Sequence, residues 1–126
     1  MKKVLIVEDD KKIRVLLKRL LEKKFRMEVC EAEDGYQGLE VYRAEAPRLI
    51  FLDILMPNMN GLEFLKELRR TDQETLVVVM TGMGDKEYVQ QMVLLGITDY
   101  IIKSEFIFHL EDRIADILYS NISVFK

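Results

Sequence analysis

The stretch of sequence that decides the fold is Leu49-Ile50-Phe51-Leu52-Asp53-Ile54-Leu55-Met56-Pro57-Asn58-Met59-Asn60-Gly61. Its first four residues are all apolar, which is typical of a strand buried on both faces. The residues from Pro57 to Gly61 are rich in turn formers, so the run does not continue as a helix. Asp53 is therefore predicted to lie at the carboxyl end of a buried strand.

The position of Asp53 has two interpretations. In open parallel α/β sheets the carboxyl edge is where ligands bind, because helix N-termini and loop backbone groups converge there. A single Asp after a strand can also cap a turn, and turn chemistry alone favours that interpretation. The choice depends on which side chains the other strands bring to the same edge.

Length and composition indicate one domain over residues 1–126. Of the 126 residues 49% are hydrophobic, and 19 basic against 22 acidic residues give a net charge of −3. A mildly acidic chain without a basic stripe offers little to nucleic acid. The sequence has neither a membrane-spanning apolar stretch nor a signal-peptide core, and its single cysteine, Cys30, suits a reducing compartment. We expect a cytoplasmic protein that contacts neither a membrane nor nucleic acid directly.

Outward from residues 49–61, the chain alternates short apolar runs with helical patterns. Strands are predicted at residues 4–7, 27–32, 49–53, 76–80 and 100–102. The predicted apolar helix faces, spaced by three and four, are Ile13, Leu16, Leu17, Leu20 and Leu21; Leu62, Leu65 and Leu68; Val89, Met92 and Val93; and Ile107, Leu110, Ile114, Ile117 and Leu118. Asp34, Asn60 and Asp85 stand where helix N-caps are expected.

Five successive strand–helix units predict an all-parallel sheet with right-handed crossovers, because parallel neighbours need long connections. The fold class is α/β: a doubly wound, flavodoxin-like (βα)5 three-layer sandwich with strand order 2-1-3-4-5. In that order the first and third strands are neighbours whose connections leave in opposite directions. A crevice is therefore expected between them at the carboxyl edge.

Polar residues follow four of the five predicted strands: Glu8–Asp10, Asp53, Thr81 and Lys103. Crowded carboxylates raise one another's pKa values unless a cation neutralises them. Their oxygen ligands favour Mg2+, with Mn2+ as the alternative. Thr81 can donate a hydrogen bond to a phosphoryl oxygen, and Lys103 can pair with Asp53 or with a phosphate. Together these residues predict an acyl-phosphate site at Asp53 rather than a turn cap.

In these stretches the sequence resembles the receiver domain of two-component response regulators. The matching parts are residues 4–10, 53–57, 60–62, 81–82 and 96–103, and the resemblance covers essentially the whole chain. It is similar to single-domain receivers of the chemotaxis-regulator kind. The resemblance implies a phosphorylation-dependent switch, not an enzyme, whose Asp53 receives a phosphoryl group from a sensor histidine kinase or a histidine phosphotransfer protein.

The resemblance also implies the metal ligands. Asp9 would bind Mg2+ directly, Glu8 would bind it mainly through water, and Asp53 would also be a ligand. The main-chain carbonyl of Leu55 would be a further ligand.

Thr81 and Tyr100 match the family's switch pair, in which the hydroxyl moves toward the phosphoryl group and the aromatic ring turns inward. By this resemblance, the face made by the fourth helix, the fifth strand and the fifth helix would change and control an unknown downstream protein. The resemblance also allows a phosphorylation-dependent dimer.

The sequence departs from the family at two positions. Ser104 replaces the proline that usually follows the lysine through a cis peptide, so we predict a trans Lys103–Ser104 bond. Gly82 stands where alanine is common, which makes the loop after Thr81 less restrained.

The residue two after Asp53 is Leu55, and the residue two after Thr81 is Met83. An aspartate-nucleophile phosphatase would need an acid at Leu55. A flavin protein of this sheet order would need a phosphate-cradling loop where this chain has the acids at Glu8–Asp10. Because neither Leu55 nor Met83 can hydrogen-bond an attacking water, slow self-dephosphorylation is expected. A free-standing receiver is favoured over a phosphorelay intermediate or the receiver part of a longer DNA-binding response regulator.

Overall fold

The computed structural model describes residues 2–82 and 84–124. Five parallel strands form one sheet in the order β2-β1-β3-β4-β5. The strands are β1 (Lys3–Val7), β2 (Glu28–Ala32), β3 (Leu49–Asp53), β4 (Leu76–Thr81) and β5 (Asp99–Ile102). The helices are α1 (Lys11–Lys23), α2 (Gly35–Glu45), α3 (Gly61–Arg69), α4 (Lys86–Leu95) and α5 (Phe106–Ser120), with 3-10 turns η1 (Lys103–Glu105) and η2 (Ile122–Val124). The predicted fold class and strand order are confirmed.

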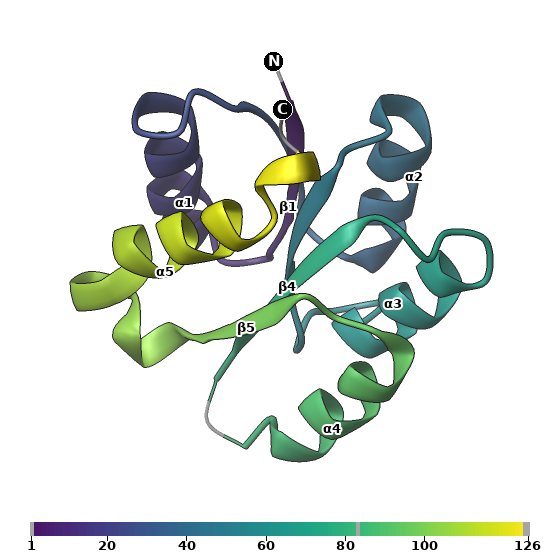
Figure 1. Ribbon diagram of the computed structural model, residues 1–126. Coiled ribbons are helices and arrows are strands. Elements are labelled where there is room, and N and C mark those ends of the chain that lie inside the picture. Colours follow the sequence, from purple (N-terminus) through teal and green to yellow (C-terminus); the bar gives the residue numbers. More distant parts are fainter. Residues whose placement is uncertain (1, 83, 125–126) are drawn as a thin grey trace.

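The molecule has three layers, with α1 and α5 on one face of the sheet and α2, α3 and α4 on the other (Figure 1). Alternate residues of each inner strand enter the two cores because side chains of a strand point to opposite faces. Phe51, for example, packs with α1 and α5, whereas Leu52 packs with α2, α3 and α4. All of β3 is buried between β1 and β4, which explains its continuous apolar run.

Helix starts follow the sequence at two of the three predicted caps. Asp34 accepts a hydrogen bond from the Gln37 N–H at 2.9 Å, and Asn60 and Glu63 form a reciprocal capping box. Asp85 precedes α4 but does not cap it. Its Oδ2 instead accepts from the Gly82 N–H at 2.6 Å, so this side chain binds the main chain directly after β4. The prediction that Asp85 caps α4 with its side chain was therefore wrong.

Two predicted core residues lie at the surface. Leu16 is 45% exposed and Val93 is 54% exposed. Each precedes or follows a residue that is fully buried against the sheet, Leu17 in α1 and Met92 in α4. Neighbouring residues differ by about 100° around a helix, so a narrow contact with the sheet encloses only one of the two. The predicted core position Ile107 lies outside the described side chains.

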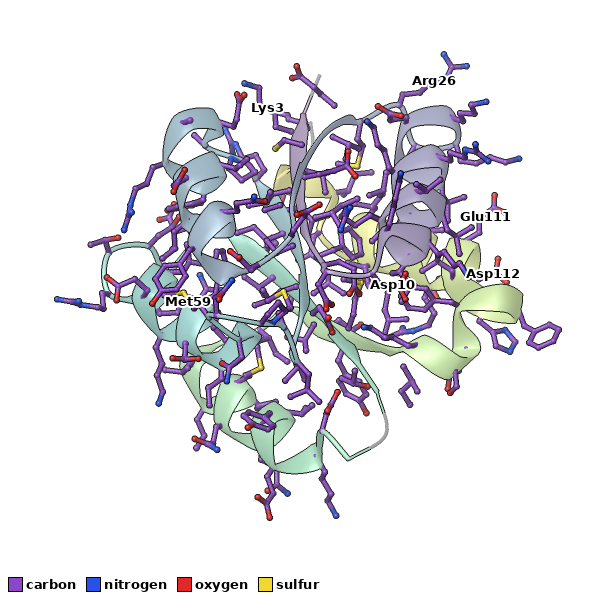
Figure 2. The ribbon with its side chains drawn as sticks, turned by 180° about the vertical axis from the view of Figure 1, so that it is seen from behind. Lys3, Asp10, Arg26, Met59, Glu111 and Asp112 are labelled. Atoms are coloured by element: carbon purple, nitrogen blue, oxygen red, sulfur yellow. The ribbon has the colours of Figure 1, made fainter. Side chains whose placement is uncertain are left out.

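Asp10, which we had not predicted as a cap, begins α1 at the end of β1 opposite Lys3 (Figure 2). Its Oδ1 accepts from the Lys12 N–H at 2.8 Å.

The described residues contain no cis peptide, so the Lys103–Ser104 bond is trans as predicted. Among the same residues, no helix has both the length and the apolar character needed to cross a bilayer.

Candidate functional site

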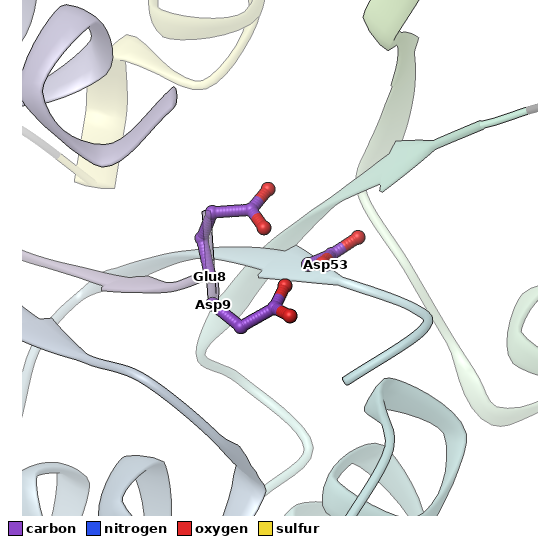
Figure 3. A group of neighbouring side chains, drawn as sticks. All are labelled: Glu8, Asp9 and Asp53. Atoms are coloured by element: carbon purple, nitrogen blue, oxygen red, sulfur yellow. The ribbon is translucent and has the colours of Figure 1, made fainter. Parts of the chain in front are cut away.

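Three acids meet at the carboxyl edge of the sheet. Each of Glu8, Asp9 and Asp53 offers a carboxylate oxygen, and these oxygens lie within 4.8 Å of one another (Figure 3). The pairing of Val7 with Leu52 across β1 and β3 brings the strand ends together. Glu8 is fully buried and Asp53 is 2% exposed, whereas Asp9 lies at the surface. The cluster therefore has a buried floor and an open side.

Lys103 supplies the positive charge of this cluster. Its Nζ lies 2.8 Å from Oδ1 of Asp53 and 2.9 Å from Oε1 of Glu8. The approach to Asp53 was expected from the order of the strands. The second ion pair, with Glu8, was not predicted, and it shows that one ammonium is shared by two buried carboxylates.

The two carboxylate oxygens of Asp53 differ in their contacts. Oδ1 accepts from the Ile54 N–H at 2.8 Å in addition to its ion pair with Lys103. Oδ2 is buried and has no hydrogen-bond partner among the described residues. Buried carboxylate oxygens are normally satisfied. An available oxygen beside two further carboxylates fits the ligand set of a hard cation such as Mg2+.

Thr81 and Tyr100 lie on the neighbouring strands β4 and β5. Thr81 ends β4, is 7% exposed, and follows Met80, which pairs with Asp53. Tyr100 is 46% exposed, so its ring is at the surface in this structure. Both residues line a cavity of about 500 Å3 between α4 and β5, together with Gly82, Asp85, Ile102 and Ser104 among others. The two predicted switch residues thus share one surface hollow.

The sequence matches the response regulator receiver domain family over residues 4–115. This chain belongs to that family. The receiver domain is 35% identical over 101 residues to chemotaxis protein CheY of Bacillus subtilis, a match that covers 80% of this chain and 84% of that protein. It is 32% identical over 116 residues to sporulation initiation phosphotransferase F of the same species, covering 92% and 93% respectively.

Solved structures agree with this assignment. The N-terminal domain of an uncharacterized protein from Wolinella succinogenes is 29% identical, with a TM-score of 0.82 and coverage of 97% of each chain. The REC domain of AraT, a response regulator from Geobacillus stearothermophilus, is 29% identical, with a TM-score of 0.80 and coverage of 99% of this chain and 98% of that one. The protein is thus a receiver domain of two-component systems. Such domains are signalling phosphoacceptors rather than conventional enzymes.

The receiver domain needs a glycine at position 61 to bring the loop after β3 close to Asp53. A Cβ atom at Gly61 would lie 2.2 Å from the main-chain oxygen of Asp53. The Gly61 N–H donates to the carbonyl of Ile54 at 2.8 Å. Any side chain at Gly61 would therefore displace the backbone that carries Asp53. The side chain of Leu55 in this loop is 54% exposed.

Burial and crowding shift the pKa values of the cluster. Burial, together with the neighbouring Asp53, raises the pKa of Glu8 to about 8. Burial also raises the pKa of Asp53, although Glu8 and Lys103 oppose that change. Burial lowers the pKa of Lys103, but its ion pairs with Asp53 and Glu8 outweigh this and raise it. Without a metal ion, the cluster therefore tends to retain a proton on one carboxyl.

We expect the metal-free receiver domain to lose stability as pH rises from about 4.5 to about 8. In that window the folded Glu8 holds a proton that the unfolded chain has released, because its pKa is raised from 4.5 to about 8. The free energy of unfolding then falls with pH, by at most about 1.4 kcal/mol per unit for one proton. Urea denaturation in a chelator measures the slope. Glu8→Gln should flatten it, and an unchanged slope in that variant would contradict the assignment.

Asp53→Ala is expected to be at least as stable as the wild type without metal. The substitution removes a crowded carboxylate while Glu8 continues to pair with Lys103. The expected change lies between zero and a gain of about 2 kcal/mol in unfolding free energy. Urea denaturation of both proteins in a chelator provides the comparison. A marked loss of stability would show that Asp53 has a structural role.

Proposed function

We propose that this receiver domain is a phosphorylation-dependent signalling switch whose acceptor is Asp53. The observation that supports it is the juxtaposition of one buried carboxylate with two further acids and one lysine. Oxygens of Glu8, Asp9 and Asp53 lie within 4.8 Å, and Lys103 Nζ lies 2.8 Å from Asp53. A turn cap would need none of these neighbours.

The phosphoryl donor is a phosphohistidine of a sensor histidine kinase or a histidine phosphotransfer protein. A carboxylate oxygen of Asp53 forms a bond to phosphorus while the bond between phosphorus and the imidazole nitrogen breaks. The imidazole keeps the electron pair of that bond and takes up a proton. Lys103 favours the ionised form of Asp53 and then pairs with the new phosphoryl oxygens, so its charge serves both states.

The cation of the site is Mg2+, with Mn2+ as the alternative. Asp9, Asp53 and the main-chain carbonyl of Leu55 would hold it directly, and Glu8 would do so mainly through water. When bound, the cation supplies positive charge that offsets the repulsion between these acids and the incoming phosphoryl group. The partnerless Oδ2 of Asp53 supports this assignment.

Thr81 and Tyr100 transmit the change. The Thr81 hydroxyl donates a hydrogen bond to the phosphoryl group, and its movement leaves room beside β4 for the Tyr100 ring to turn inward. The half-exposed ring of Tyr100 and the hollow that it shares with Thr81 support this step. The surface of α4, β5 and α5 then changes its shape for a downstream protein or, on dimerisation, for a second copy.

The cellular role that we favour is a free-standing cytoplasmic receiver. The matches to chemotaxis protein CheY and to sporulation initiation phosphotransferase F, which cover 84% and 93% of those proteins, support a single-domain role. The second of these names favours a phosphorelay intermediate as the alternative, and the receiver of a longer DNA-binding regulator is a third. Phosphotransfer profiling against purified histidine kinases and phosphotransfer proteins, with the natural length checked by mass spectrometry, separates these roles.

Labelling by a small phosphodonor such as acetyl phosphate should require a divalent cation. In a chelator the acids repel the donor, so we expect the rate of labelling to fall at least about 100-fold. The measurement is intact-mass spectrometry over time with Mg2+, with Mn2+ and with chelator alone. Asp9→Asn should need a higher Mg2+ concentration than the wild type. Equal labelling rates with and without cation would overturn the proposed function.

A further inference from the structure

Arg14 is a buried arginine beside the acids, and neither the proposed reaction nor the sequence patterns account for it. It lies in the first turns of α1 and is 8% exposed. Its Nη1 donates to the main-chain oxygen of Glu8 at 2.7 Å and to that of Asp9 at 3.2 Å. One guanidinium thus binds the backbone of Glu8 and of Asp9, the first two of the three acids that follow β1.

The same guanidinium is anchored on its other side by the end of β2. Nη2 donates to Oε1 of Glu33 at 3.4 Å, and Nε lies 3.5 Å from Oε1 of Glu31. The end of β2 lies beside the acids that follow β1, because the Glu8 N–H donates to the carbonyl of Ala32 and so continues the pairing of β1 with β2. Arg14 therefore connects α1, the loop that carries Glu8 and Asp9 (the acid loop) and the end of β2.

Local geometry directs this side chain toward the loop. Asp10 caps α1, and the Arg14 N–H donates to the Asp10 carbonyl at 3.1 Å in the first turn. Long side chains on a helix point back toward its N-terminus, which here is the acid loop. The planar fork of a guanidinium can bind several acceptors at fixed angles, whereas a lysine ammonium offers a single charged centre. Burial of such a group is costly unless its donors and charge are paired, and here Nη1 and Nη2 donate hydrogen bonds while Nε lies beside the carboxylate of Glu31.

We propose that Arg14 is a positioning residue for the cation site: it fixes the peptide units of Glu8 and Asp9 so that their carboxylates face Asp53. This inference rests on the proposed function, because it assumes that the acids bind a cation. Groups that orient metal ligands from behind typically change metal affinity by about 10- to 100-fold when they are replaced.

A positioning role and a simple charge effect predict opposite changes in the affinity for a divalent ion when Arg14 is replaced. Arg14 is a cation next to the acids, so by charge alone its removal would strengthen the binding of a divalent ion. By positioning, its removal frees the acid loop and weakens binding. Lys18 provides a matched control, because it is a cation of the same helix whose Nζ lies 3.3 Å from Oε2 of the same Glu31. The described contacts of Lys18 do not include the backbone of Glu8 or Asp9.

The experiment measures Mn2+ affinity by electron paramagnetic resonance for the wild type, Arg14→Met, Arg14→Lys and Lys18→Met, without any phosphodonor. We expect Arg14→Met to lose affinity at least about tenfold and Arg14→Lys to lose several-fold, because one ammonium cannot replace both carbonyl contacts. Lys18→Met should bind as the wild type does or slightly more tightly. Amide NMR shifts of Glu8 and Asp9 should move in the Arg14 variants and stay in place in Lys18→Met.

Unchanged or tighter Mn2+ binding in folded Arg14 variants would overturn the inference. If Arg14→Met does not fold, Arg14→Lys decides, because it keeps the charge and most of the aliphatic stem. Asp9→Asn is measured in parallel as a test of the site itself. If the wild type and Asp9→Asn bind Mn2+ equally, the proposed cation site is wrong, and that result differs from a wild-type site that is insensitive to Arg14.

Discussion

Asp53→Ala should reduce labelling by a phosphodonor to background, a loss of at least about 1,000-fold. The variant lacks the oxygen that forms the bond to phosphorus, and the neighbouring carboxyls do not replace it. Glu8 is fully buried, and its carboxylate pairs with Lys103. Asp9 lies on the open side of the cluster, and the described ion pairs of Lys103 do not include it. The acceptor role should therefore be specific to Asp53.

Intact-mass spectrometry of wild type and Asp53→Ala with acetyl phosphate and Mg2+ tests this expectation. Peptide mapping of the labelled wild type locates the modified residue. Glu8→Gln is the informative control, because it alters the buried floor of the cluster and should slow labelling without abolishing it. Labelling of Asp53→Ala at the wild-type rate would rule out this acceptor.

The phosphorylated receiver domain should lose its phosphoryl group slowly, and Leu55→Asn/Met83→Glu should lose it at least about tenfold faster. Hydrolysis requires a water molecule aligned opposite the leaving carboxylate, and an apolar side chain cannot hydrogen-bond that water. Leu55 lies two residues after Asp53 and is 54% exposed. Met83 lies outside the described residues, so its part in this prediction comes from the sequence alone.

The measurement is the decay of phosphorylated protein in Mg2+ after removal of the phosphodonor. Each single variant should be compared with the double variant. Leu94→Asn is a matched control, because Leu94 is 88% exposed on α4 and the same chemical change there should leave the decay rate unaltered. If the double variant decays no faster than the wild type, these side chains do not control the attacking water. A long lifetime would suit a sustained output more than a rapid one.

The sequence alone determined the architecture and the composition of the acid cluster. A strand that reads Leu49-Ile50-Phe51-Leu52 has no polar face, so it must be covered on both sides, and alternation with helices requires parallel pairing. Parallel strands end at one edge, so Glu8, Asp53 and Lys103 had to converge there. The helix start at Asn60 was also readable, since a capping box is a local arrangement. The ligand and switch roles of these residues remain predictions.

Only the tertiary structure decided how the side chains share their partners. Lys103 binds Glu8 as well as Asp53, Asp85 binds the Gly82 N–H instead of capping α4, and Arg14 binds the acid loop. Apart from the expected approach of Lys103 to Asp53, none of these contacts was predicted from the sequence. Arg14 looks like one more basic residue of α1 until the pairing of β1 with β2 brings Glu31 and Glu33 beside it. The periodicity of apolar residues indicates which face of a helix or strand is buried. The partners of a buried polar side chain depend instead on which hydrogen-bonding groups the packed elements place within its reach.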